Sequence, residues 1–116
     1  MSRMLKIRVS PEAARDLEEI KQYIARELKN PDAAKRTVHT IIAELRTLER
    51  FPEAGPSIEA LTGYTTELRY FVCGKRLALY KIVDGAVFVA RIIDPKQDYL
   101  RVLFGDDFWE RSNDSL

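Results

Sequence analysis

Four short stretches of the chain show the apolar patterning that is typical of β-strands. They are residues 4–9, 67–72, 76–83 and 86–93. The first alternates apolar and basic side chains, and the other three are rich in aromatic and β-branched residues. Asp84-Gly85 separates the last two stretches, and this pair favours a type I′ turn because both of its residues accept positive φ. With a second turn at residues 73–75, the pattern predicts an antiparallel meander over residues 66–93.

Between the first and second strands, apolar residues recur every three or four positions, which indicates two amphipathic helices. Each helix has a start signal in which a capping residue precedes proline, at Ser10-Pro11 and at Asn30-Pro31. The second helix should end at Phe51-Pro52. The apolar positions are Ala13, Leu17, Ile20, Ile24 and Leu28 in the first helix, and Ala34, Val38, Ile41, Leu45 and Leu48 in the second. Because the connection is so short, we expect an antiparallel helical hairpin.

These elements predict an α+β fold of order β-α-α-β-β-β, an antiparallel sheet with the helical hairpin packed on one face. Residues 53–65 are rich in Gly, Pro and Thr without periodicity, which favours a surface loop. Residues 98–104 favour a short helical or irregular segment. We expect one domain over residues 1–105 and an acidic tail over residues 106–116, with the second face of the sheet left open.

Composition suits a soluble domain with a single core. The 116 residues are 46% hydrophobic and 32% charged, and no apolar run is long enough to cross a bilayer. Arg3, Lys6 and Arg8 interrupt any apolar region of a signal peptide. The single cysteine, Cys73, excludes an internal disulfide and favours a reducing, cytoplasmic compartment. We interpret Cys73 as an ordinary thiol.

Charge is unevenly distributed although the net charge is only +1. Residues 66–104 carry seven lysines and arginines against four acidic residues, whereas residues 105–116 carry one against four. Both blocks are also typical of solvated surface. Phe108 and Trp109 within the tail leave two interpretations open: the tail masks the basic residues, or it packs as a helical stub at an edge of the sheet.

Motifs for metal or cofactor chemistry are missing, so we expect neither a metal nor a cofactor. His39 is the single histidine and lies within a helix. Asp94 and Asp98 flank Pro95, which favours turn capping over a metal pair. The remaining reactive groups are arginine, lysine and tyrosine, which suit phosphate.

In a metal-independent ribonuclease, Arg76, Lys96 and Tyr99 would share the proton transfers and the stabilisation of phosphate charge. The remaining cations would bind nucleic acid: Arg69, Lys75, Lys81, Arg91 and Arg101. Ion pairs with Glu67 or the acidic tail are the alternative for Arg69 and Arg91.

Several segments together resemble toxins of the RelE/ParE superfamily, the toxin halves of bacterial type II toxin–antitoxin modules, which include plasmid-stabilisation proteins. They are "FPEAGP", "ELR" followed by "GKRLALYKI", and "VFVARIIDPKQDYLRVLFG". The resemblance covers roughly residues 3–105, and its last segment matches at Arg91, Asp98, Tyr99 and Leu103. Asp94 stands where the superfamily commonly has His or Tyr, and Pro95-Lys96-Gln97 stands where it has Gly-Arg-Arg.

The resemblance implies a cognate antitoxin as partner and one of two activities. RelE-like members cleave mRNA in the ribosomal A site without metal; Arg76 matches their arginine at the start of the middle strand, Lys96 substitutes for a second arginine, and Tyr99 is the nearest hydroxyl. ParE-like members poison DNA gyrase. We expect a ribosome-dependent mRNA endonuclease first, with a gyrase inhibitor, or a degenerate toxin that retains only antitoxin binding, as alternatives.

Overall fold

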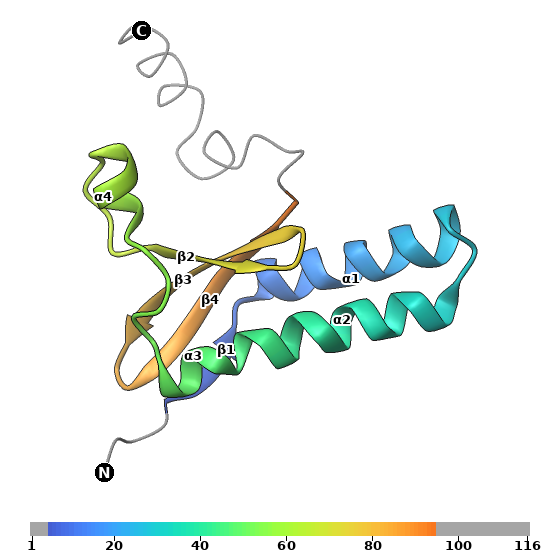
Figure 1. Cartoon of the computed structure of the whole chain (residues 1–116), viewed down its shortest axis with the longest axis horizontal. Helices are drawn as coiled ribbons and strands as arrows, with labels where there is room; N and C mark the ends of the chain where they lie inside the picture. The colour runs from blue at the N-terminus through green and yellow to red at the C-terminus, as the bar shows by residue number, and fades with distance from the viewer. Residues whose placement is uncertain (1–4, 95–116) are drawn as a thin grey trace, which may run out of the picture.

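A computed structural model describes residues 5–94 of the chain and shows a helical hairpin packed on a four-stranded sheet (Figure 1). The elements follow the order β1 (Lys6–Val9), α1 (Pro11–Glu27), α2 (Pro31–Leu45), α3 (Thr47–Arg50), α4 (Ile58–Thr62), β2 (Arg69–Cys73), β3 (Arg76–Val83) and β4 (Ala86–Ile93). The α+β class and the helical hairpin on one face are confirmed. The segment predicted at residues 98–104 lies outside the described residues.

The sheet has the strand order β1-β4-β3-β2. The predicted meander is confirmed, because β2, β3 and β4 pair antiparallel, and Asp84 and Gly85 both have positive φ, 49° and 73°. The expectation of a wholly antiparallel sheet is wrong, because β1 pairs parallel with β4, with Lys6 beside Ala86. The two helices carry the chain from β1 across to the far edge of the sheet, as a parallel pair requires a crossover connection.

Both predicted helix starts are confirmed. The Ser10 hydroxyl accepts the Ala13 N–H at 2.9 Å, and the Asn30 side chain accepts the Ala33 N–H at 3.0 Å. The second helix is shorter than predicted, because a break at Arg46 separates α2 from α3. Within residues 5–94 no helix is long and apolar enough to span a membrane.

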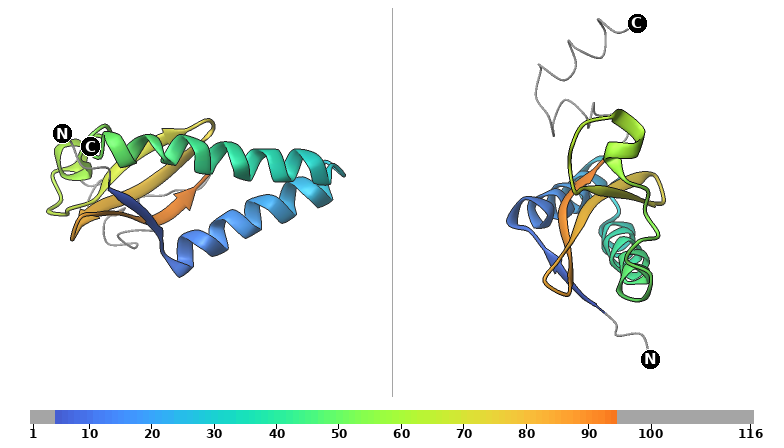
Figure 2. Two further views of the ribbon diagram at one scale, coloured as in Figure 1. Left: turned by 90° about the horizontal axis from the view of Figure 1, so that it is seen from below. Right: turned by 90° about the vertical axis from the view of Figure 1, so that its left-hand side faces the viewer.

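The main core fills the space between the helical hairpin and one face of the sheet (Figure 2). It takes most of the apolar positions that helical spacing and strand patterning identified, but Leu28, at the C-cap of α1, is 64% exposed. Its fully buried members include Ala13, Leu45, Leu48, Ala78, Tyr80, Val87 and Val89. The apolar stripe of each helix therefore packs toward the strands.

The second face of the sheet is partly covered, which corrects the expectation that it is open. The segment predicted as a surface loop contains α4, whose first turn is capped by the Ser57 hydroxyl. Ile58 is fully buried and packs with Leu79 and Ile93 on this face. The apolar contact between α4 and these distant strands is long-range, so the periodicity of a five-residue helix could not predict it.

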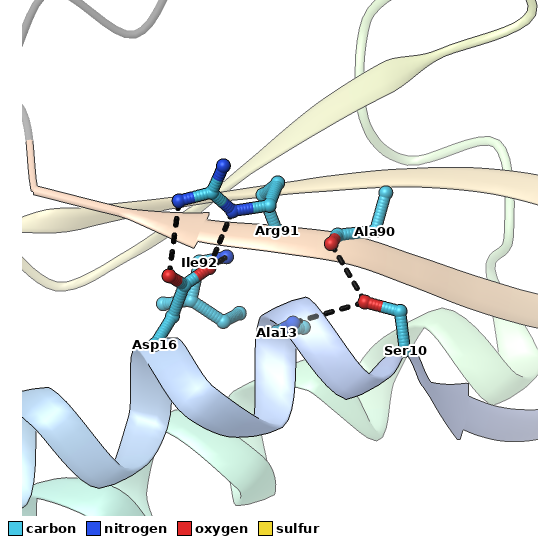
Figure 3. A network of polar contacts seen from close by, with 6 residues as sticks. All are labelled: Ser10, Ala13, Asp16, Ala90, Arg91 and Ile92. Atoms are coloured by element: carbon cyan, nitrogen blue, oxygen red, sulfur yellow. Dashed lines mark hydrogen bonds and ion pairs between the residues drawn. The ribbon is translucent and has the colours of Figure 1, made fainter. Parts of the chain in front are cut away.

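A carboxylate–guanidinium pair joins α1 to β4 (Figure 3). Asp16 accepts the Nε–H and Nη2–H of Arg91 at 2.8 and 3.0 Å, and it also accepts the Ile92 backbone N–H at 2.9 Å. At the N-cap of the same helix, the Ser10 hydroxyl donates to the Ala90 carbonyl at 2.7 Å. The first helix is thus held to the last strand by polar contacts as well as by apolar packing.

The segment before α4 is held by Tyr80, which lies in the middle of β3. The Tyr80 hydroxyl donates to the Pro52 carbonyl at 2.6 Å and accepts the Gly55 N–H at 2.9 Å. Arg69 donates to the Gly55 carbonyl at 2.8 Å. Desolvation raises the pKa of Tyr80, so its hydroxyl keeps the proton that it donates. A Cβ atom at Gly55 would overlap the Tyr70 carbonyl and lie 2.7 Å from the Tyr80 hydroxyl oxygen.

Removing the Asp16 carboxylate should destabilise the fold substantially. Asp16→Ala leaves the partly buried Arg91 guanidinium and the Ile92 N–H without their acceptor, so we expect the free energy of unfolding to fall by about 3 kcal/mol. Urea unfolding followed by circular dichroism measures this change. Glu18→Ala, an exposed acid on the same helix, should change it by less than about 0.5 kcal/mol. Equal stability of the two variants would contradict the assigned role of Asp16.

The Tyr80 contacts predict a second stability effect. Tyr80→Phe removes one donor and one acceptor from buried partners, so we expect a loss of about 2 kcal/mol. Gly55→Ala should cost at least as much, because its methyl group displaces the segment from the Tyr70 carbonyl. Thermal unfolding of both variants, with exposed Tyr23→Phe as the matched control, measures these losses. Wild-type stability of Gly55→Ala would show that the close approach at Gly55 is unimportant.

Candidate functional site

The cations predicted to bind nucleic acid do not gather on one surface within the described residues. Arg69 is bound to the Gly55 carbonyl, and Arg91 is bound to Asp16. Neither bond involves Glu67, the alternative partner that the sequence suggested, and the acidic tail lies outside the described residues. Lys81 lies over the ring of Phe88, with its ammonium nitrogen 5.7 Å from the ring centroid. Lys96, Tyr99 and Arg101 lie outside the described residues, and their assigned roles stay predictions.

Strand register separates Arg69 from Arg76. Arg69 begins β2 and pairs with Tyr80, whereas Arg76 begins β3 and pairs with Cys73 at the far end of β2. The four residue steps along β2 from Arg69 to Cys73 correspond to about 13 Å. The two arginines therefore stand at opposite ends of the β2–β3 pair, which does not favour a joint contact with one phosphate group.

The pKa values of Arg91 and Cys73 fit roles in the fold. The hydrogen bond to Asp16 raises the pKa of Arg91, so this guanidinium stays charged and paired. Desolvation in the core raises the pKa of Cys73 to about 12, with a smaller contribution from Glu44. At neutral pH the sulfur is therefore a protonated thiol rather than a nucleophilic thiolate. This agrees with the interpretation of Cys73 as an ordinary thiol.

Arg76 and Lys75 line a cleft between the helical hairpin and the β2–β3 turn, which we call the Arg76 cleft. The helical hairpin extends past the end of the sheet (Figure 1). Side chains of α1 and of the start of β3 line the cleft together. Two cavities of about 420 and 630 Å³ share Tyr23, Arg76 and Asp94 and therefore adjoin. The larger one also contains Leu28, Thr37 and Lys75.

The Arg76 side chain has a hydrogen-bonding capacity that the fold does not use. Its Nε is buried and lacks a hydrogen-bond partner, and no other buried side-chain nitrogen or oxygen in residues 5–94 shares this condition. A guanidinium offers its donors in a planar fork that matches a carboxylate or a phosphate. The Arg76 cleft can therefore accept an anionic group beside the apolar side chains of α1.

The sequence did not predict the long-range hydrogen bonds of two side chains, Asp16 and Tyr80. Asp16 lies three residues after Ala13 and four before Ile20, so a carboxylate on the apolar face of a helix was the available signal. Tyr80 falls in an apolar strand, and nothing local indicates that its hydroxyl binds residues 52 and 55. His39 lies at an exposed position of α2. No group of three or more potential metal ligands occurs between residues 5 and 94.

Comparisons with known proteins bear on the family. The model of the ParE toxin of the type II toxin–antitoxin system parDE matches residues 7–99. A solved chain titled "Chromosomal ParDE TA system from P. aeruginosa" has a TM-score of 0.67 and 19% sequence identity, over 80% of this chain and 98% of that chain. At that identity the likeness supports the fold alone. No match was found among curated proteins.

The family match covers most of the chain, including α1, α2 and all of the strands β2–β4. The resemblance to the RelE/ParE superfamily is thereby confirmed, on the ParE side of the superfamily. The chain belongs to the ParE toxin family of type II toxin–antitoxin systems.

Proposed function

We propose that this toxin inhibits DNA gyrase by binding to it, and that it does not cleave mRNA. The observation that carries the proposal is the internal use of Arg69 and Arg91, which hydrogen-bond to Gly55 and Asp16 at separate places. Membership of the ParE family supports the same choice, because ParE-like toxins poison gyrase. The ribosome-dependent endonuclease that the sequence suggested first becomes the less supported alternative.

The chemistry of RNA cleavage explains why this observation matters. A metal-independent ribonuclease needs a base, an acid and several cations around one phosphate group. Of the residues assigned to catalysis, Arg76 lies in the cleft, and Lys96 and Tyr99 lie outside the described residues. Arg69 and Arg91, which were assigned to nucleic-acid binding, are engaged elsewhere. Inhibition by binding needs a complementary surface and no proton transfer, so it tolerates this arrangement.

A cognate antitoxin is the second partner in the proposal. Toxins of this family are held inactive by an antitoxin, and we infer that this chain meets its own antitoxin in the cytoplasm. A short reading frame next to the toxin gene that encodes an acidic protein would support this partner. Antitoxin binding would be shared by an active gyrase inhibitor and by a degenerate toxin, so it does not separate those two alternatives.

A supercoiling assay tests the proposal. Purified toxin at micromolar concentration should inhibit ATP-dependent supercoiling by gyrase, and equimolar antitoxin should restore supercoiling. Glu18→Ala, a variant at an exposed position that does not line the cleft, should inhibit like the wild type. In vitro translation with primer extension is the parallel measurement, and we expect no cuts at the ribosomal A site.

Other outcomes identify the alternatives. Normal supercoiling together with A-site cuts would refute the gyrase proposal and establish the endonuclease. Normal supercoiling and uncut mRNA, with no growth arrest on overexpression, would indicate a degenerate toxin.

A further inference from the structure

We propose that the Arg76 cleft binds an acidic, amphipathic peptide segment of the antitoxin, with a carboxylate of that peptide on Arg76 and an apolar side chain against Tyr23 and Leu28. This inference rests on the proposed toxin function and adds the place and the chemistry of partner recognition. It also gives Arg76 a different task from the catalytic one that the RelE-like pattern suggested.

The charge at one end of the cleft favours a carboxylate. The Arg76 Nε is buried and has no acceptor among residues 5–94, and Lys75 and the hydroxyl-bearing Thr37 line the same cavity. A buried donor that lacks an acceptor destabilises the free protein, and an acceptor supplied by a partner removes that penalty. A neighbouring cavity of about 410 Å³ shares Thr37, Lys75 and Arg76 and extends this end along α2, where it is lined by Arg36, Thr40 and one acid, Glu44.

The other end of the cleft is apolar. Tyr23 lies in the second half of α1, and Leu28 is the C-cap of this helix. Their exposed fractions are 60% and 64%. Both side chains line the larger cavity beside the buried Ile24. Large apolar side chains grouped beside a cation favour an amphipathic ligand, because an apolar side chain of the ligand removes their surface from water.

The acids around the cleft favour a peptide over a nucleic acid. Glu19 and Asp94 line the smaller cavity, together with Asp16, whose charge is paired with Arg91. A polyphosphate backbone would bring many negative charges close to these carboxylates, and its affinity depends on surrounding cations. A peptide can place one carboxylate on Arg76 and present neutral or basic groups to the acidic wall. The mixed charge of the cleft would therefore also fix the direction of the bound peptide.

Dissociation constants of the complex test this proposal. The full-length toxin would be titrated with the antitoxin encoded next to its gene, using isothermal titration calorimetry. We expect Arg76→Gln and Tyr23→Ala each to weaken binding at least tenfold, and Arg76→Lys to recover part of the loss because it keeps the charge without the fork. Tyr23 is exposed, so its variant should fold even if replacing Arg76 disturbs the sheet.

Matched controls come from the opposite end of the molecule. Arg50→Gln and Phe51→Ala remove an exposed arginine and a 62% exposed aromatic ring next to each other at the end of α3. Both should bind antitoxin within twofold of the wild type. Circular dichroism and thermal unfolding of every variant separate a loss of binding from a loss of folding.

Each remaining outcome would overturn the proposal. Wild-type affinity of both Arg76→Gln and Tyr23→Ala would exclude the cleft as the antitoxin site. Unchanged antitoxin affinity with lost gyrase inhibition would assign the cleft to gyrase. A second variant, which carries Asp106→Asn and Asp107→Asn, tests whether the acceptor for Arg76 belongs to this chain. If this variant and Arg76→Gln both bind antitoxin more tightly than the wild type, the acceptor is part of the toxin itself and the proposal is wrong. A wild-type toxin that binds no antitoxin would refute the proposed partner, whatever the variants do.

Discussion

The contact of the Asp16 carboxylate with Arg91 and the Ile92 N–H is the constraint on which the rest of the structure depends. It joins the first helix to the last strand, whose residues are 75 and 76 positions apart in the sequence. The Asp16 side chain is 11% exposed, so its charge is largely removed from water and requires these donors. Because Tyr23 and Leu28 belong to the same helix and its C-cap, the position that Asp16 imposes on α1 also sets one wall of the Arg76 cleft.

The arginines of this chain divide between folding and recognition according to whether their donors are satisfied. Arg69 holds the segment around Gly55, and Arg91 holds α1. Movement of either side chain toward an external phosphate would leave a buried carbonyl or carboxylate without its partner. Arg76 differs because its buried Nε has no acceptor among residues 5–94. The hydrogen bonds of the described residues therefore single out Arg76 for external recognition, although the three residues look alike in the sequence.

Local signals predicted most of the fold, and long-range contacts account for what they missed. Ser10-Pro11, Asn30-Pro31 and Asp84-Gly85 act through neighbouring backbone groups, so the caps and the turn appeared where the sequence placed them. The parallel direction of β1 depends on the course of the whole crossover. The burial of Ile58 against Leu79 and Ile93 depends on residues more than twenty positions away, and a short helix carries too few apolar positions to reveal it. The same distinction applies to the candidate site. The sequence identified the basic side chains, but it did not predict that Asp16 and Gly55 would be their hydrogen-bond partners.

The residues around Arg76 relate the local electrostatics to the kind of partner. Asp94 and Arg76 line both cavities of the cleft. A carboxylate there opposes the approach of a phosphate group through like charge. A polyphosphate backbone brings many negative charges, whereas a peptide can bring a single carboxylate to Arg76 beside apolar side chains. The charges around Arg76 therefore favour a protein partner over RNA.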